Sequence, residues 1–318
     1  MGPTEPAATD DTARAGHVTP VALDDFDWSA DYGPAARLRT TLEAATSTDG
    51  ASPLDEAALL RLRHEGLAGS SLWLGDPPAE GFAWLHVEAG ELALDVAVDP
   101  AHRRTGLGTA LVEAALAGTD RLPVNAWAHG NHPGAAALAA GHGFERVRDL
   151  WVMRRPTSQE LPPLRDIDGI DVRPFVPGQD EEAFLALNAE AFAGHPEQGR
   201  MTRADLDQRM AEAWFDPGGF FVAEPSDDRG NLIGFHWTKV HDESPGIGEV
   251  YVVGVSPHAQ GSGLGRLLTR TGLDHLARRG LTEVLLYVEA DNAPARAVYE
   301  RLGFSHADAD THVQYRRG

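Results

Sequence analysis

The stretch that decides the fold is "QGSGLG" at Gln260–Gly265. It follows an apolar run, "EVYVVGV" (Glu249–Val255), and leads into an amphipathic one, "RLLTRTGLDHLAR" (Arg266–Arg278). A near copy, "RRTGLG" at Arg103–Gly108, stands between "LDVAVDP" and "TALVEAALAG" in the first half of the chain. Because strand, glycine loop and helix follow one another twice, we predict a duplicated α/β fold.

The flanking segments extend this pattern in both halves. In the second half, hydrophobic periodicity predicts strands at 170–175, 220–224, 232–240, 249–255, 283–289 and 311–317, and helices at 180–192, 202–214 and 292–304 besides the one after the loop. The first half repeats the late part of this order, with strands at 94–99 and 124–129 and a helix at 134–141. We expect two tandem domains, each with a mixed central sheet flanked by helices.

The length of 318 residues also fits two domains, since one domain typically has about 150 residues. Residues 1–18 lack hydrophobic periodicity, which predicts a disordered tail. A proline-rich segment predicts a linker at 155–169. The expected domains are therefore residues 19–154 and 170–318.

Composition excludes several kinds of function. A net charge of −21 argues against nucleic acid and anionic membranes as partners, and no apolar run approaches the roughly 18 residues of a membrane span. The absence of cysteine excludes disulfides and thiolate metal sites, and the N-terminus lacks the apolar core of a secretory signal. We expect a cytoplasmic monomer. The fourteen histidines include no His-Glu-x-x-His pattern, so no metal site is predicted.

The loop itself predicts a pyrophosphate ligand. Small residues allow the backbone N–H groups of such a turn to converge, and the following helix adds a partial positive charge. The dinucleotide pattern fails because Arg266 stands where its third glycine is required, and the P-loop pattern fails because no Lys-Ser or Lys-Thr follows. Both copies instead match Gln/Arg-x-x-Gly-x-Gly behind a strand and before a helix.

On these motifs the chain resembles the GNAT acetyltransferases, whose version of this loop binds the pyrophosphate of acetyl-CoA. More narrowly, it resembles two-domain members that acetylate the cysteinyl amine of a cysteinyl-glucosaminyl-inositol. The segments that carry this resemblance are "WAHG" (Trp127–Gly130), "MRRP" (Met153–Pro156), "FAGHPEQG" (Phe192–Gly199), "GFHWTKVH" (Gly234–His241), "GEVYVVGV" (Gly248–Val255) and "LLYVEADN" (Leu285–Asn292). The resemblance covers about residues 19–315.

The resemblance implies the following sites. In the second domain, acetyl-CoA would contact Val253, Gly254, Val255, Gln260, Gly261, Ser262, Gly263, Leu264, Gly265, Arg266, Asn292, Ala293, Pro294, Ala295, Arg296 and Ala297. In the first domain, a second acetyl-CoA would contact Val96, Ala97, Val98, Arg104, Thr105, Gly106, Leu107, Gly108 and Thr109. The sugar-inositol acceptor would contact Glu56, Glu197, Lys239, Glu249 and Tyr287. Because the family often has arginines at the positions of Gly261 and Ser262, backbone amides must carry more of the phosphate binding here.

Two residues of the second domain suit the chemistry of acetyl transfer. An α-amino group has a pKa near 8, so a carboxylate can remove its proton directly or through water. Glu249 is the candidate base, and strand alternation would put it on one face with Tyr251 and Val253. The resemblance implies that the Tyr299 hydroxyl protonates the departing thiolate. Gly254 is the expected site of a bulge that opens this strand from its neighbour.

The first copy lacks both groups. Aligning the two loops puts Leu92 opposite Glu249, and aligning Gly143-Phe144 with Gly303-Phe304 puts Ala139 opposite Tyr299. Glu91 and Asp95 lie near enough for a register slip to supply a base, but no tyrosine occurs between Tyr32 and Tyr251. We therefore expect the second domain to be the catalyst and the first a non-catalytic acetyl-CoA-binding, structural or substrate-capping domain.

Two alternatives stay open. One is a tandem GNAT enzyme that acetylates another small amine or a protein N-terminus, and the other is a non-catalytic acyl-CoA sensor. Lys239, the one lysine among 27 basic residues, has two interpretations as well. It is either the last survivor of a drift toward arginine or a position that needs a compact ammonium group.

Overall fold

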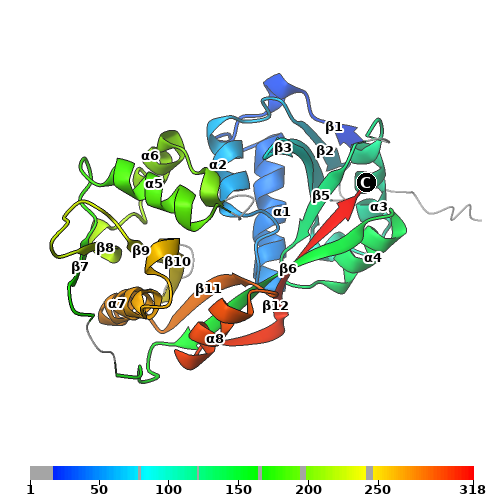
Figure 1. Ribbon diagram of the computed structural model, residues 1–318. Helices are drawn as coiled ribbons and strands as arrows, with labels where there is room; N and C mark the ends of the chain where they lie inside the picture. Colours follow the sequence, from blue (N-terminus) through cyan, green and yellow to red (C-terminus); the bar gives the residue numbers. More distant parts are fainter. Residues whose placement is uncertain (1–16, 78–79, 120–121, 164–166, 194–197, 241–245) are drawn as a thin grey trace, which may run out of the picture. The chain divides into compact units, whose positions relative to one another are not determined.

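The computed structural model describes residues 17–77, 80–119, 122–163, 167–193, 198–240 and 246–318 (Figure 1). The chain forms two compact units. The N-terminal unit contains the described residues up to Arg148 together with His312–Gly318, and the C-terminal unit contains Asp149–Thr311.

The division between the units falls at Arg148 and Asp149, which differs from the expected linker at 155–169. It lies within strand β6 (Glu145–Pro156), because residues 150–156 pair with β11 (Glu283–Glu289) of the C-terminal unit. Similarly, the end of β12 (Ser305–Arg317) pairs with β5 (Val124–Ala128) of the N-terminal unit. Periodicity along the sequence identifies a strand but does not say which sheet it joins.

The N-terminal unit is a mixed sheet with helices on both faces. Its strands lie in the order β1-β2-β3-β4-β5-β12, in which only β4 and β5 are parallel neighbours. Its elements in chain order are β1 (Val18–Pro20), η1 (Leu23–Asp25), α1 (Pro34–Asp49), α2 (Glu56–His64), β2 (Ser71–Gly75), β3 (Gly81–Glu88), β4 (Glu91–Val98), η2 (Pro100–His102), α3 (Leu107–Leu116), β5 and α4 (Pro133–Gly141).

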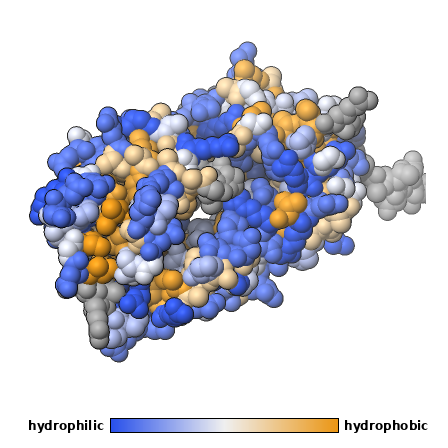
Figure 2. All heavy atoms as spheres, viewed as in Figure 1, coloured by the Kyte–Doolittle hydropathy of each residue, from blue (hydrophilic) through white to orange (hydrophobic). Residues whose placement is uncertain are grey.

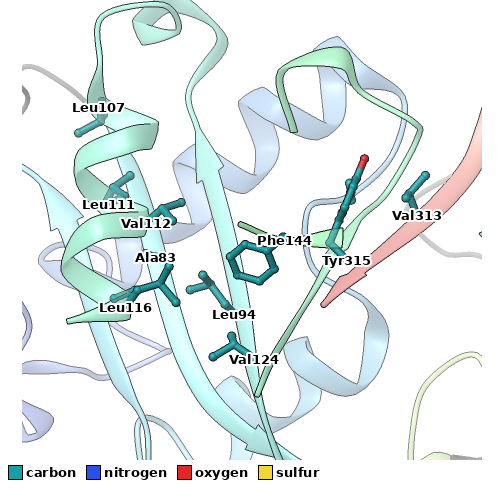
Figure 3. Close-up of a cluster of buried hydrophobic side chains, with 12 residues drawn as sticks. Ala83, Leu94, Leu107, Leu111, Val112, Leu116, Val124, Phe144, Val313 and Tyr315 are labelled. Carbon is teal, nitrogen blue, oxygen red and sulfur yellow. The ribbon is translucent and has the colours of Figure 1, made fainter. Parts of the chain in front are cut away.

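Alternation along β3 builds the two hydrophobic cores of this unit. Ala83 packs with α3 in the cluster shown in Figure 3, which also contains Phe144 and Tyr315. Its neighbours Phe82 and Trp84 pack on the opposite face with α1 and α2. Burying large apolar side chains on both faces is the main source of stability for such a layered fold.

The C-terminal unit repeats the architecture with strand order β6-β11-β10-β9-β8-β7, and β10 and β11 are its parallel pair. Its remaining elements are β7 (Ile170–Pro174), α5 (Glu181–Ala191), η3 (Gln198–Arg200), α6 (Arg203–Met210), η4 (Pro217–Gly219), β8 (Phe220–Pro225), β9 (Gly234–Val240), β10 (Ile247–Val255), η5 (Pro257–Ala259), α7 (Leu264–Arg278) and α8 (Ala293–Arg301). The predicted fold class is confirmed in both units.

Helix α6 is shorter than its sequence pattern predicts. Thr202 caps it through a capping box with Asp205, in keeping with the prediction that Thr202 begins this helix. The helix ends at Met210 rather than at Trp214, and the chain then turns so that the Phe215 N–H donates to the Glu212 carbonyl. Trp214 therefore lies on a turn that packs against the aromatic core of the unit around Phe184, Phe235 and Trp237.

Hydrophilic residues cover most of the face shown in Figure 2, in keeping with the net charge of −21. Among the described helices, none has the length and the apolar character that crossing a bilayer requires. Within the same described ranges, no three His, Cys, Asp or Glu residues are placed to hold a metal ion.

His236 on β9 gives the C-terminal unit a pH-dependent stability. Its ring is fully buried, Nδ1–H donates to the Leu268 carbonyl at 2.8 Å, and burial lowers its pKa to about 4. Between pH 6.5 and 4 the unfolded chain binds a proton that the folded unit excludes, so acid removes about 3 kcal/mol of unfolding free energy.

We expect His236→Gln, which keeps an N–H donor but does not titrate, to lose less stability than the wild type over this pH range. Urea unfolding of both proteins at pH 7 and pH 4.5 measures the difference, and carboxylate contributions common to both cancel. Equal losses in the two proteins would contradict the assignment.

Candidate active site

The glycine loop of the C-terminal unit connects β10 to α7. Gly261 has a φ of 79° and Gly263 a φ of 90°, a left-handed conformation that favours glycine. Gly263 is the N-cap of α7 and forms no side-chain cap bond, and the Leu264 N–H donates to Ser262 Oγ at 3.3 Å. Left-handed residues at alternate positions before a helix N-terminus can direct amides toward an anion, as the sequence predicts for this loop.

The loop of the N-terminal unit has the same backbone conformation. Gly106 has a φ of 90°, and Arg104 has a φ of 66° at the position of Gly261. The left-handed conformation costs an arginine energy that it does not cost a glycine. The N-terminal loop therefore has the same conformation as the C-terminal loop although Arg104 is strained in it. The side chain of Arg103 is engaged outside the loop, because its guanidinium binds Asp49 at 2.6 Å and the Val98 carbonyl.

Strands β10 and β11 separate beside the loop. Their parallel ladder joins Ile247–Val250 to Glu283–Leu286, and no pair joins them beyond Val250 in the described part of the chain. Val253, Gly254 and Val255 therefore lie on the half of β10 that has left β11. The N-terminal unit has the same opening, because β4 and β5 pair only at Leu92–Val124 and Ala93–Asn125.

A β-bulge on β10 lies at Tyr251, so the prediction of a bulge at Gly254 is wrong. The register with β9 shifts between Val250 and Val252, whereas Gly254 pairs regularly with Phe235. Glycine is required at 254 for another reason: a Cβ there would lie 2.4 Å from the Phe235 ring. The Phe235 ring lies against the strand at this point, and it has room there because residue 254 has no side chain.

The bulge also changes which side chains share a face. Val250 packs with Leu273 and Leu276 of α7, whereas Val252 packs in the aromatic core with Phe184 of α5. Without the extra residue these two valines would share one face. The expected common face of Glu249, Tyr251 and Val253 is therefore wrong for Val253.

Val253 pairs with His236, whose ring bonds Leu268 of α7. It therefore faces α7. Tyr251 packs in the aromatic core on the α5 face. The bulge was not predictable from β10 alone, because it depends on the register with β9.

Three of the expected acceptor residues come together on the α5 face of the sheet. Glu249 pairs with Lys239 on β9 and with Leu285 on β11, and Tyr287 follows on the same face of β11 by alternation. The exposed fractions of Glu249 and Lys239 are 5% and 9%, whereas that of Tyr287 is 41%. The nearly buried carboxylate of Glu249 thus lies beside Lys239, and the more exposed Tyr287 lies on the same face of the neighbouring strand.

Of the other two expected acceptor residues, Glu56 is the first residue of α2 in the N-terminal unit. Glu197 lies outside the described residues.

Tyr299 lies on α8, against the opposite face of the sheet. Its ring packs beside Phe304 at 6.0 Å and against the cluster that contains Leu276, Val284 and Leu286. Burial raises the pKa of Tyr299 to about 12, so the phenol carries its proton at neutral pH. The sequence Asn292–Ala297 forms the start of α8, where Asn292 Oδ1 accepts a hydrogen bond from the Ala295 N–H at 3.2 Å.

The structure aligns the two copies as the sequence comparison does. The Phe304 N–H donates to the Tyr299 carbonyl at 3.0 Å, and the Phe144 N–H donates to the Ala139 carbonyl at 2.9 Å. The last ladder pairs, Val250–Leu286 and Ala93–Asn125, place Leu92 at the position of Glu249. The N-terminal copy therefore has apolar side chains at both positions.

A small pocket of the N-terminal unit contains a polar cluster that the sequence comparison missed. It is lined by Asp55, Ala58, His86, Glu88, Ala93, Leu94, Asp95, Asn125, Ala126, Trp127 and His129. His86 Nε2 lies 2.9 Å from Asp95 Oδ2, and its Nδ1 lies 3.1 Å from Arg61 Nη1. Because arginine only donates, the Nε2–H of His86 donates to Asp95. Strand pairing brings His86 of β3 beside Asp95 of β4, and the packing of α2 adds Arg61.

Two segments of the sequence match known families. Residues 184–304 match the acetyltransferase (GNAT) family, and residues 69–146 match an acetyltransferase (GNAT) domain. Each match contains one glycine loop and the helix that follows it. The duplication predicted from the loops is thus found independently.

Curated relatives match most of the chain. The mycothiol acetyltransferase of Nocardioides sp. is 51% identical over 300 residues, which cover 89% of this chain and 97% of the relative. That of Salinispora arenicola is 50% identical over 289 residues, which cover 89% of this chain and 92% of the relative. The chain belongs to the mycothiol acetyltransferase family. It is an N-acetyltransferase with two GNAT domains.

Solved structures agree with the two-domain GNAT architecture. A GCN5-related N-acetyltransferase from Sphaerobacter thermophilus has a TM-score of 0.69 and 27% identity, over 94% of this chain and 95% of its own. A tandem GNAT protein from the clavulanic acid biosynthesis pathway has a TM-score of 0.66 and 19% identity, over 94% of this chain and 97% of its own. The second likeness shows the fold alone.

Proposed function

We propose that the chain transfers the acetyl group of acetyl-CoA to the cysteinyl amine of cysteinyl-glucosaminyl-inositol, giving mycothiol and CoA. The observation that carries this proposal is the 51% identity to the mycothiol acetyltransferase of Nocardioides sp. over 89% of this chain. The geometry of the C-terminal unit supports it, because a phosphate-binding loop, a strand opening and a carboxylate adjoin on one strand.

In this proposal acetyl-CoA lies in the opening between β10 and β11. Backbone amides of the loop Gln260–Arg266 hold its pyrophosphate, since the left-handed glycines and the N-terminus of α7 suit an anion. The backbone of Val253–Val255 and the first turn of α8, Asn292–Ala297, border the pantetheine and the thioester. Backbone groups on the separated half of β10 are the ones available to it.

The reacting groups approach this opening from the two faces of the sheet. Glu249, on the α5 face, takes a proton from the acceptor ammonium group. The neutral amine then forms a C–N bond to the thioester carbonyl, and the C–S bond breaks. Tyr299, on the α7 and α8 face, gives its phenol proton to the departing thiolate, and the extra proton on the new amide nitrogen then restores the phenol. A raised pKa keeps the phenol proton in place until the thiolate leaves.

The acceptor is held by polar side chains around Glu249. Lys239 and Tyr287 share its face of the sheet, and the family resemblance adds Glu56 and Glu197. A sugar-inositol presents many hydroxyl groups, for which an ammonium donor, a phenol and carboxylate acceptors are suitable partners.

The N-terminal unit, in this proposal, binds a second acetyl-CoA and does not catalyse. Its loop residues 104–109 keep the conformation of the C-terminal loop, and Val96–Val98 lie past the same strand opening. Leu92 and Ala139 replace the base and the phenol, so neither proton transfer has a side chain there.

The test is to incubate the protein with acetyl-CoA and cysteinyl-glucosaminyl-inositol and to follow CoA by chromatography and the acceptor by mass. We expect stoichiometric CoA release and an acceptor heavier by one acetyl group on nitrogen. If CoA were released only with another amine, the acetyltransferase activity would stand and this acceptor would be wrong. Acetyl-CoA binding without release with any amine would instead support the acyl-CoA sensor.

A further inference from the structure

Lys239 is the one lysine of the chain, and its position is unusual for a lysine. The sequence has 27 basic residues, and all others are arginine. Only 9% of its surface is exposed, although lysine is rarely buried in folded proteins. It lies on β9 directly opposite Glu249 of β10. The ammonium group is therefore kept in a mostly dry place beside the proposed base.

Two aromatic rings surround this ammonium group. Nζ lies 4.6 Å from the centre of the Trp214 ring and 5.4 Å from the centre of the Tyr251 ring. Both distances lie within the range of cation–π attraction, which strengthens when the cation is removed from water. The two rings thus compensate part of the hydration that Lys239 loses.

The two rings are themselves fixed from behind. They meet edge to face with centres 5.2 Å apart, and each also contacts the fully buried Trp237 at 5.7 Å and 5.4 Å. The Nε–H of Arg209, on α6, donates to the Tyr251 hydroxyl at 3.0 Å. Strand alternation already places Tyr251 on the α5 face with Glu249, and the bulge moves only the residues after it to other faces.

We propose that Trp214 and Tyr251 are positioning residues, which hold the Lys239 ammonium group beside Glu249 so that it donates hydrogen bonds to a hydroxyl-rich acceptor. This inference rests on the proposed function. It assigns the acceptor affinity to two residues that do not touch the thioester. It also explains the single lysine, because a planar guanidinium would need more width than a compact ammonium between the two rings.

Magnetic resonance can test the position of Lys239 without an assay. Because the chain has one lysine, growth on ¹³C-lysine gives one set of side-chain resonances and no assignment problem. We expect the Hε protons to be shifted upfield from those of free lysine by the ring currents of Trp214 and Tyr251. In Trp214→Leu the shift should shrink, and in Trp214→Phe most of it should remain. Wild-type resonances at the free-lysine position would overturn the proposal.

Steady-state kinetics test whether the position of Lys239 contributes to binding of the acceptor. We expect Trp214→Leu to raise the KM of the acceptor about tenfold. The KM of acetyl-CoA should stay within about twofold of the wild-type value, because the loop at Gln260–Arg266 is untouched. Trp214→Phe should restore most of the acceptor KM. Tyr251→Phe, which keeps the ring and loses the Arg209 bond, should change it about twofold or less.

The matched control is Trp28→Leu in the N-terminal unit. Trp28 also lies under a cation, with Arg39 at 5.7 Å, but it belongs to the unit that does not contain Lys239, Glu249 or Tyr287. We expect it to leave the acceptor KM within about twofold of wild type. Equal effects of Trp28→Leu and Trp214→Leu, or equal changes in both KM values, would overturn the positioning role.

The two proposals can fail separately. A wild-type protein with shifted Hε resonances that does not acetylate the acceptor would overturn the proposed function alone. A wild-type protein that acetylates the acceptor with unshifted resonances would overturn the positioning of Lys239 alone.

Discussion

Glu249→Gln is expected to lower kcat for acetyl transfer by about 100- to 1,000-fold, the range of a lost general base. The amide has the shape of the carboxylate, so the contacts of a residue that is 5% exposed are kept while its proton affinity is lost. Acetyl-CoA affinity should remain near the wild-type value, because the glycine loop begins only after Val255. Steady-state kinetics with both substrates, together with an acetyl-CoA titration, measure the two effects.

The matched control for this variant is Glu91→Gln. Glu91 precedes Leu92, the counterpart of Glu249 in the N-terminal unit, and its carboxylate binds Arg316 at 2.8 Å on the surface. It should leave kcat within about twofold of wild type. A Glu249→Gln enzyme with wild-type kcat would remove Glu249 as the base. A large loss in Glu91→Gln would place chemistry in the N-terminal unit.

Tyr299→Phe is the second substitution with a large expected effect, a fall in kcat of about 100-fold. Removing the hydroxyl leaves the ring and its packing against Phe304, so the fold should be unchanged. The thiolate would then have to leave without a positioned proton donor. Turnover measured at a saturating concentration of each substrate checks this loss.

The pH dependence of the wild-type enzyme provides a separate check on Tyr299. A phenol with a pKa of about 12 keeps its proton across the range in which the protein can be assayed. Ionisation of Tyr299 should therefore cause no fall in the wild-type kcat between pH 7 and pH 10. Any fall in that range should be present in Tyr299→Phe as well. Tyr315→Phe, in the core of the N-terminal unit, is the control and should keep kcat within about twofold of wild type. An alkaline loss that disappears in Tyr299→Phe would show that the phenol ionises well below pH 12.

In the proposed function, one fold binds the same ligand twice and uses it once. Both units have the left-handed loop and the opening between their parallel strands. Binding depends mainly on backbone groups, which duplication preserves as long as the strand and loop keep their conformation. Catalysis, as proposed here, depends on the side chains of Glu249 and Tyr299, for which the N-terminal unit has Leu92 and Ala139.

Local sequence predicted what local structure determines. The glycine loops, the strand before each and the helix after each follow from glycine at left-handed positions and from hydrophobic periodicity. The alignment of Ala139 with Tyr299 followed from a shared Gly-Phe pair, and the same backbone hydrogen bond joins the helix to that pair in both units. The family, and with it the candidate site residues, followed from short motifs in register with these elements.

Tertiary structure alone decided the features that depend on strand pairing. The bulge lies at Tyr251 and not at Gly254, because the register of β10 with β9 shifts there, and this turns Val253 to the α7 face. The Trp214 ring beside Lys239 comes from a turn after α6, and the Asp95–His86 pair joins two neighbouring strands. The boundary between the two units, which falls within β6, also depends on strand pairing, because partners far apart in the sequence determine which sheet each strand joins. A sequence specifies each strand by its own pattern, but register and neighbours are properties of the folded sheet.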